Sequence, residues 1–94
     1  MEHKTVIVSG RVQGVFFRDS AKEVARSLGI FGTVQNVSDG SVRIEIEGEH
    51  EQLEQFLFWC AMGPKDAVVT NMDVSKKDEI QNFTAFDILP DLIL

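Results

Sequence analysis

The segment GRVQGVFFRD, residues 10 to 19, contains residue types that together bind an anion. Gly14 permits the positive φ of a curled loop, and a loop that curls before a helix gathers backbone N–H groups without helical partners. Arg18 lies where the next helix should begin, although the helix dipole disfavours a cation there by up to about 1 kcal/mol. We interpret the loop as an anion site that the Arg18 guanidinium closes with a bidentate grip on phosphate or carboxylate.

A purely structural interpretation of this loop also fits its composition. In that interpretation Gly10 and Gly14 shape a tight connection, and Arg18 is a solvated surface charge. Helix N-termini bind anions in general, and glycine loops are common. The segment is not a known nucleotide loop either, because it has neither Gly-Lys-Ser/Thr nor G-x-G-x-x-G. Spacing alone therefore leaves both interpretations open.

Asn36 is the second candidate for chemistry. It lies three residues before Asp39, inside a β-rich arm in which asparagine is depleted. Asparagine near a hairpin is often turn chemistry, so a structural role stays open beside a functional one. The amide can hold a water molecule but cannot take its proton at neutral pH.

Other reactive residue types are few and scattered. The only cysteine is Cys60, which is expected to be a buried small hydrophobe. His3 lies in a terminal segment and His50 at an acidic helix start, and both are expected to be solvated. These residues form no metal-ligand pattern, so no metal and no cofactor are predicted.

Two helices are expected around these candidates. Residues 18–28 carry an apolar stripe of helical period through Ala21, Val24, Ala25 and Leu28, and Gly29 with Ile30 suits a left-handed C-terminal cap. A capping box of Ser20 and Glu23 would move the start of this helix inward by two residues. Residues 49–62 form the second stripe, which Gly63-Pro64 ends; its members are Leu53, Phe56, Leu57 and Cys60.

The remaining segments have the composition of strands. They are residues 5–10, 31–37, 41–47 and 67–75, with a possible short edge strand in 83–89. The Asp39-Gly40 pair predicts a hairpin turn between the second and third. In 41–47 we expect a wet face of Arg43, Glu45 and Glu47; in 67–75 we expect one side to carry Val68, Thr70, Met72 and Val74.

The order strand, helix, strand, strand, helix, strand predicts an α+β fold. Right-handed βαβ connections place both helices on one face of an antiparallel sheet, which is the ferredoxin-like sandwich. Ninety-four residues suffice for a single domain spanning 1–94. Because this fold supports many functions, the function must come from the site.

The net charge and the hydropathy of the chain limit the kinds of partner that it can bind. The net charge of −6 argues against nucleic acid and anionic membranes, which require a basic footprint. Residues 1–44 nevertheless carry six Lys or Arg against four Asp or Glu, so the loop lies in the half that suits an anion. With no signal peptide, no membrane-spanning run and one cysteine, a cytoplasmic protein is expected.

Two motifs, GRVQGVFFR and GTVQNVSDGSV, resemble the signature of the acylphosphatase family. That signature is a G-[RK]-V-Q-G-V-x-F-R loop followed by a G-x-V-x-N-x-x-D-G-x-V hairpin. The resemblance covers nearly the whole chain, since LGI, EGE and a helix ending in Gly-Pro follow in the family's order. The chain departs from the pattern at Thr33, commonly aromatic, and at Phe16, often glycine; the first could alter packing beside the site, and the second adds an apolar wall that could favour a bulky acyl group.

The resemblance implies a ferredoxin-like monomer that hydrolyses the carboxyl-phosphate bond of acylphosphates without metal or covalent intermediate. Arg18 matches the family's phosphate-gripping arginine, and Asn36 matches the asparagine that orients the attacking water. The phosphate cradle corresponds to the backbone of Gln13, Gly14, Val15, Phe16 and Phe17. The implied partners are a small acylphosphate and inorganic phosphate, as product or inhibitor.

Two alternatives come from other functional classes. A non-catalytic ferredoxin-like module could bind an anion or a partner through the same rim, but it would need only Arg18 and not Asn36. RNA binding on the open sheet face is disfavoured by the acidic charge and by the missing paired aromatics of an RNA-recognition sheet.

Overall fold

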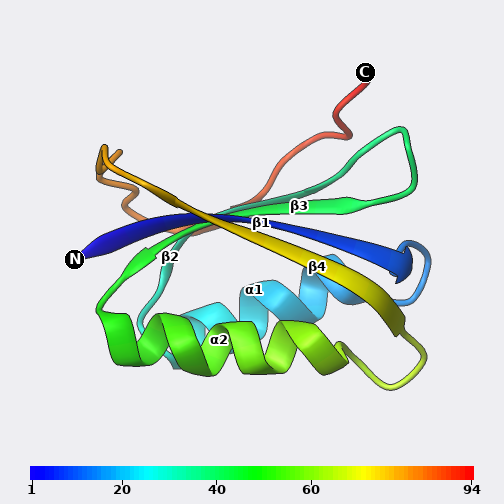
Figure 1. The fold of residues 1–94 in the computed structure, drawn as a ribbon, viewed down its shortest axis with the longest axis horizontal. Helices are drawn as coiled ribbons and strands as arrows, with labels where there is room; N and C mark the ends of the chain where they lie inside the picture. The colour runs from blue at the N-terminus through cyan, green and yellow to red at the C-terminus, as the bar shows by residue number, and fades with distance from the viewer.

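The chain forms a five-stranded sheet with both helices on one of its faces (Figure 1). The computed structural model describes residues 1–94. In chain order the elements are β1 (Glu2–Arg11), α1 (Phe17–Ser27), β2 (Phe31–Asn36), β3 (Val42–Gly48), α2 (His50–Met62), β4 (Val68–Lys77) and β5 (Phe86–Ile88). Neither helix is long and apolar enough to cross a membrane.

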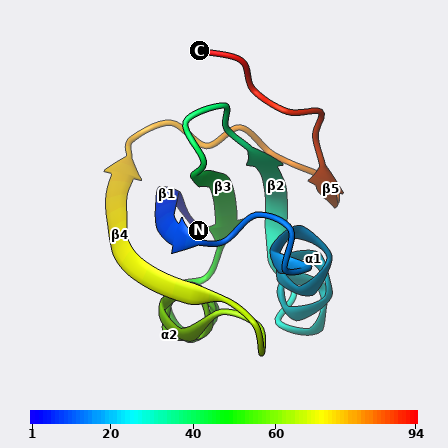
Figure 2. The ribbon, with the colours of Figure 1, turned by 90° about the vertical axis from the view of Figure 1, so that its right-hand side faces the viewer.

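The strand order is β4-β1-β3-β2-β5 (Figure 2). The first four of these strands are paired antiparallel, as the ferredoxin-like order predicts. The sheet as a whole is mixed, because β5 pairs with β2 in parallel. Residues 78–85 carry the chain from β4 at one edge to β5 at the other, so the short last strand cannot form an antiparallel hairpin with its neighbour in sequence.

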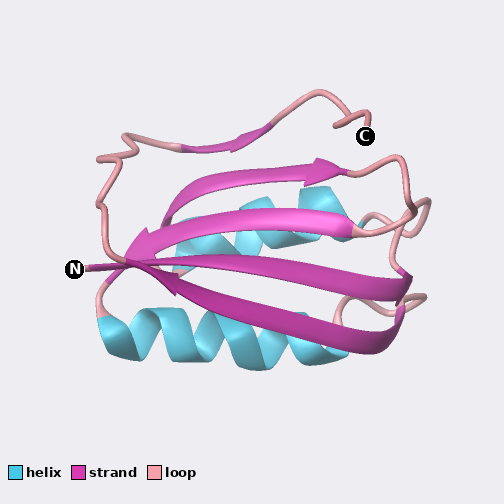
Figure 3. Ribbon diagram, turned by 45° about the horizontal axis from the view of Figure 1, so that its top comes forward, coloured by secondary structure: helices cyan, strands magenta, loops and turns pink.

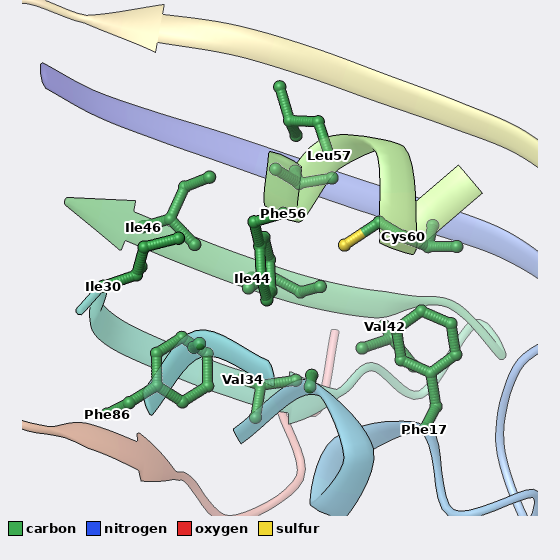
Figure 4. Packing of buried hydrophobic residues seen from close by; sticks show 14 of the residues in the cluster. Phe17, Ile30, Val34, Val42, Ile44, Ile46, Phe56, Leu57, Cys60 and Phe86 are labelled. Carbon is green, nitrogen blue, oxygen red and sulfur yellow. The ribbon is translucent and has the colours of Figure 1, made fainter. Parts of the chain in front are cut away.

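The core lies between the sheet and the helices (Figures 3 and 4). Alternate residues of the strands point into it, and α2 adds the stripe that its sequence predicts. The largest fully buried hydrophobic side chains are those of Phe17, Phe56, Phe86, Ile30, Ile44, Ile46 and Leu53. Burial raises the pKa of the Cys60 thiol, so this cysteine stays protonated and packs as a hydrophobe.

The ends of α1 differ in how well they were predicted. The helix begins at Phe17 and its cap makes no side-chain hydrogen bond, so the capping box of Ser20 and Glu23 does not form. At the other end Gly29 has φ 72°, and the Ile30 N–H donates to Ala25 O at 2.9 Å. This is the predicted left-handed cap, and it turns the chain into β2.

The predicted face of β4 is wrong because of an irregularity in its pairing with β1. Ser9 pairs with Asn71 and Gly10 pairs with Val69, so one residue of β4 is skipped at Thr70. Val69 and Met72 therefore both pack against the core. Gly10 is required here, since a Cβ on it would lie 2.2 Å from the carbonyl oxygen of Val68.

The expectation that His3 and Glu47 are solvated is also wrong. Both are 1% exposed, and the His3 Nδ1–H donates to Glu47 Oε2 over 2.8 Å. The Nε2 of His3 lies 2.6 Å from Glu45 Oε1. Residues 78–85, which we call the crossing segment, cover this cluster, because the backbone N–H groups of Gln81 and Phe83 both donate to the Glu47 carboxylate. His50, in contrast, is exposed as expected.

The buried cluster predicts a pH-dependent stability. Burial alone would lower the pKa of His3, but its bonds to Glu45 and Glu47 outweigh burial and raise that pKa. Burial would raise the pKa of both carboxyls, yet hydrogen bonds from their donors hold both below the ordinary value. The contribution of protonated His3 to the free energy of unfolding is thus full below about pH 6.5 and is lost as the pH rises further. The contribution of the two carboxylates is lost as the pH falls below about 4.5.

Denaturant unfolding of the wild type and His3→Gln at several pH values measures this effect. The difference in unfolding free energy between the two proteins should be largest near pH 6 and should shrink by about pH 9, as His3 loses its proton. His50→Gln, which changes an exposed histidine whose ion pairs with Glu2 and Glu54 are also at the surface, should differ only slightly from the wild type. A difference that stays constant with pH would contradict a charged His3.

Candidate active site

The loop between β1 and α1 contains two residues in the left-handed conformation. Gly14 has φ 74°, as predicted, and Phe16 has φ 62° and ψ 27°. For a residue with a side chain this conformation costs about 1–2 kcal/mol, and strain of this kind is concentrated at functional sites. The Phe16 side chain is also 76% exposed. The glycine signalled the first turn in the sequence, whereas the second was signalled only by the family pattern, in which the position of Phe16 is often glycine.

A hollow of about 380 Å³ opens beside this loop. Arg18 and Asn36, the two candidate side chains, both line it, although they come from α1 and from the end of β2. The other lining residues are Val12, Gly14, Phe16, Phe17, Asp19 and Ile88. The structure thus brings together two residues that lie eighteen positions apart in the chain.

Arg18 is the cation of this hollow. It is the second residue of α1, and its side chain is 39% exposed. Its Nη1 lies 3.7 Å from Oδ1 of Asp91, whose side chain is 61% exposed. A pair this long and this exposed is worth at most about 1 kcal/mol, so the guanidinium remains available to another anion.

The C-terminal segment brings Asp91 to this place. After β5 it continues beside β2, where Leu92 N–H donates to Asn36 O at 2.8 Å and Ser38 N–H donates to Leu92 O at 2.9 Å. Sequence reasoning found no role for this segment. The pairing is parallel and joins residues more than fifty positions apart, so no local pattern signals it.

Asn36 contributes an unusual polar atom. The residue is 9% exposed, and its Oδ1 is buried without a hydrogen bond from any group of the protein. Leaving a buried acceptor unpaired costs about 1–3 kcal/mol, so such atoms call for an explanation. The oxygen itself is inaccessible, so it is through the rest of the side chain that Asn36 lines the hollow.

The remaining predicted site residues fall into two groups. Gly14, Phe16 and Phe17 line the hollow, and the Phe17 side chain is anchored in the core. Gln13 and Val15 do not line it. Thr33 faces the other side of the sheet, so the expectation that it alters packing beside the site is wrong.

A second hollow, of about 470 Å³, lies over the sheet face away from the helices. It contains Thr33, Arg43 and the edge of the His3 cluster beneath the crossing segment. The carboxylates of Glu45 and Glu47 already accept hydrogen bonds from the protein there. Glu45 in this hollow is thus already paired with His3, Thr5 and Arg43, and the hollow at Arg18 is the better candidate for chemistry.

Fold and site together define a class: a ferredoxin-like α+β sandwich with a left-handed loop before its first helix and an asparagine at the end of β2 that lines the same hollow. Comparison with known proteins agrees with this description. The family model described as Acylphosphatase matches residues 4–88. The chain belongs to the acylphosphatase family.

Individual relatives cover almost the whole chain. An acylphosphatase of Methylococcus capsulatus is 42% identical over 92 residues, which are 98% of this chain and 100% of that protein. The crystal structure of acylphosphatase from Bacillus subtilis superposes with a TM-score of 0.92 at 32% identity, covering 95% of this chain and 99% of that one. An acylphosphatase from Coxiella burnetii gives a TM-score of 0.90 at 33% identity, with 94% and 92% covered.

Proposed function

We propose that this enzyme hydrolyses the carboxyl-phosphate bond of acylphosphates, with Arg18 binding the phosphoryl group and Asn36 orienting the attacking water. Membership of the acylphosphatase family supports the activity. The observation that carries the roles of the residues is that both side chains line one hollow at the start of α1. Arg18 without Asn36 would suffice to bind an anion, but it would not orient a water molecule for attack.

Binding of the phosphoryl group uses two kinds of donor. The first N–H groups of α1 have no helical acceptors, and the left-handed residues Gly14 and Phe16 curl the preceding backbone toward the same point. The Arg18 guanidinium supplies parallel N–H groups and a full positive charge. As negative charge spreads over the phosphoryl oxygens in the transition state, these fixed donors stabilise it.

Attack requires a water molecule on the phosphorus. In this proposal the side-chain amide of Asn36 holds the water by a hydrogen bond, which leaves an oxygen lone pair of the water directed at the phosphorus. A bond forms between the water oxygen and phosphorus, and the bond from phosphorus to the carboxylate oxygen breaks. The water proton passes to a phosphate oxygen, so the products are a carboxylate and inorganic phosphate.

The reaction in this form needs no general acid, because a carboxylate is a good leaving group. It also uses no metal or cofactor, since Arg18 and the backbone supply the stabilising charge. Phe16 and Ile88 give the hollow apolar lining beside the phosphate position, and we retain the prediction that this wall favours bulky acyl groups. We further propose that the protein acts in the cytoplasm as a monomer of one domain spanning 1–94.

A non-catalytic anion-binding module is the alternative function. It would use Arg18 and the loop in the same way, but it would give no role to the Asn36 side chain that lines the same hollow. The presence of Asn36 beside Arg18 therefore favours the hydrolase.

Hydrolysis of benzoyl phosphate by the purified protein, in the presence of a chelator, tests the proposed function. We expect release of inorganic phosphate and competitive inhibition by added phosphate. Binding of phosphate without any turnover would instead identify the binding module.

Asp91→Asn is expected to strengthen phosphate binding. The Asp91 carboxylate lies 3.7 Å from the Arg18 guanidinium and repels any anion that approaches it. For an exposed pair the gain should be modest, about two- to fivefold in the inhibition constant of phosphate, and it should fade at high salt. Asp87→Asn, which removes an exposed carboxylate of β5, serves as the control. An equal effect of both changes would mean that the gain comes from the change in net charge alone.

A further inference from the structure

The side chain of Gln13 leaves the phosphate loop and binds the turn between β2 and β3. Its Nε2 donates to the carbonyl oxygen of Val37 at 2.8 Å and to that of Ser41 at 2.8 Å. A primary amide has two N–H donors, so both are used in this contact. The contact is partly buried, and the side chain does not line the hollow.

The turn that Gln13 binds is braced by its own hydrogen bonds. Val37 N–H donates to Ser41 O at 2.9 Å, and Gly40 N–H donates to Val37 O at 2.9 Å. The Asp39 carboxylate accepts the Ser41 N–H at 2.9 Å and the Ser41 hydroxyl at 2.6 Å. The turn is therefore rigid, and Asn36 is the residue immediately before it.

The two halves of the site are thus joined at one side chain. Arg18 and the curled backbone stand on the loop that contains Gln13, and Asn36 stands on the strand that enters the turn. No other side-chain hydrogen bond links this loop to this turn. That link is therefore the direct side-chain connection between the phosphate loop and the turn that follows Asn36.

We propose that Gln13 is a positioning residue that sets the distance between the phosphate-binding loop and the water-orienting Asn36. This inference rests on the proposed function of those two groups. In-line attack tolerates little misplacement, and a shift of about 1 Å can cost a hundredfold in rate. The loop binds phosphate with its own donors, so loosening the link affects turnover and leaves phosphate binding intact.

Gln13→Met tests the inference, because methionine has a similar length and no donor. The Val37 and Ser41 carbonyls keep their bonds within the turn, so the variant leaves no buried acceptor unpaired. We expect kcat to fall about tenfold and the inhibition constant of phosphate to change less than about twofold. Gln13→Glu, isosteric but without a donor, should lower kcat at least as far.

Gln35→Met is the matched control. Gln35 also uses its Nε2 to bind a backbone carbonyl, that of Pro90 at 3.0 Å, but it is a neighbour of Asn36 that contacts no part of the loop. We expect its kcat to stay within about twofold of wild type. An equal loss in both variants would assign Gln13 a general structural role and overturn the inference.

A double-mutant cycle with Asn36→Ala separates positioning from stability. Once Asn36 is gone, nothing remains for Gln13 to position, so Gln13→Met should lower kcat by less than about twofold in that background. Independent, multiplying losses would overturn the inference.

A measurement that does not depend on turnover completes the test. The NMR signals of the Asn36 side-chain amide should shift or broaden in Gln13→Met and not in Gln35→Met, while inorganic phosphate still shifts the backbone amides of residues 14–18. Unchanged Asn36 signals would overturn the positioning role even in an active enzyme. Shifted Asn36 signals in a protein without hydrolytic activity would support the link and refute only the proposed function.

Discussion

Arg18→Ala is expected to lower kcat/KM for benzoyl phosphate by about a thousandfold or more, and to abolish competitive inhibition by phosphate. The guanidinium supplies the only cationic side chain of the hollow, and an arginine on a transferring phosphoryl group is worth about 10³–10⁵ in rate. Steady-state kinetics at several phosphate concentrations measure both losses. Because Arg18 stands at the unfavourable end of the helix dipole, unfolding experiments should show unchanged or slightly higher stability.

Two further variants make the role of Arg18 specific. Arg11→Ala removes an exposed cation at the end of β1 that does not line the hollow, and it should leave kcat/KM within about threefold of wild type. Arg18→Lys keeps the charge without the planar fork, so it should recover only part of the loss. Equal defects in Arg11→Ala and Arg18→Ala would point to general positive potential and contradict a direct grip.

Asn36→Ala is expected to lower kcat about 10²- to 10³-fold while phosphate still inhibits with nearly its wild-type constant. The change removes the group proposed to orient water and leaves Arg18 and the loop in place. The fold should persist, because the deleted Oδ1 accepts no hydrogen bond from the protein. Steady-state measurements of kcat and of the inhibition constant of phosphate, made on the same preparation, give the two readouts.

Asn71→Ala is a suitable control for this second variant. Asn71 lies on β4, exposed, with its side chain bonded only to Asp73 at 3.2 Å. Its loss should leave kcat unchanged. Retention of wild-type turnover in Asn36→Ala would refute the proposed role of the asparagine, and a joint loss of turnover and phosphate binding would assign Asn36 to binding.

Patterns confined to one element predicted that element well. The stripe of α2 is buried as its period requires, and Gly29 ends α1 through the expected left-handed cap. These features depend on neighbours within a few residues, where spacing determines geometry. The same is true of the hairpin around Asp39-Gly40, whose bounds differ by one residue or so.

Features that depend on distant segments were missed. His3 and Glu47 are buried because residues 81 and 83 donate hydrogen bonds to Glu47 from 34 and 36 positions away. The skipped residue of β4 arises from its pairing with Gly10, and Asp91 reaches Arg18 only through the parallel course of the C-terminal segment. A charged residue in a strand of alternating pattern predicts a solvent-exposed face. That prediction fails where a distant part of the chain covers the residue, and no local pattern reveals such a cover.

The candidate site lies between these cases. The sequence of the loop by itself predicts an anion site. The prediction that Arg18 and Asn36 belong to the same site came only from the resemblance to the family. The structure confirms that both line one hollow, and their catalytic roles stay predictions. The left-handed Phe16 had one signal in the family pattern, where its position is often glycine, and the link through Gln13 could be found only in the structure.

The two edges of the sheet offer different opportunities for self-association. At the edge beside the hollow, β5 and the C-terminal segment cover the backbone of β2, so only the three-residue β5 is presented there to another copy. The opposite edge is the ten-residue β4, which has a free side but carries Asp73, Lys76 and Lys77. Charges of this kind discourage edge-to-edge pairing. Any β-sheet aggregation of the folded protein would therefore begin at β4, which β1 and β3 separate from β2, and would leave the entrance of the hollow open.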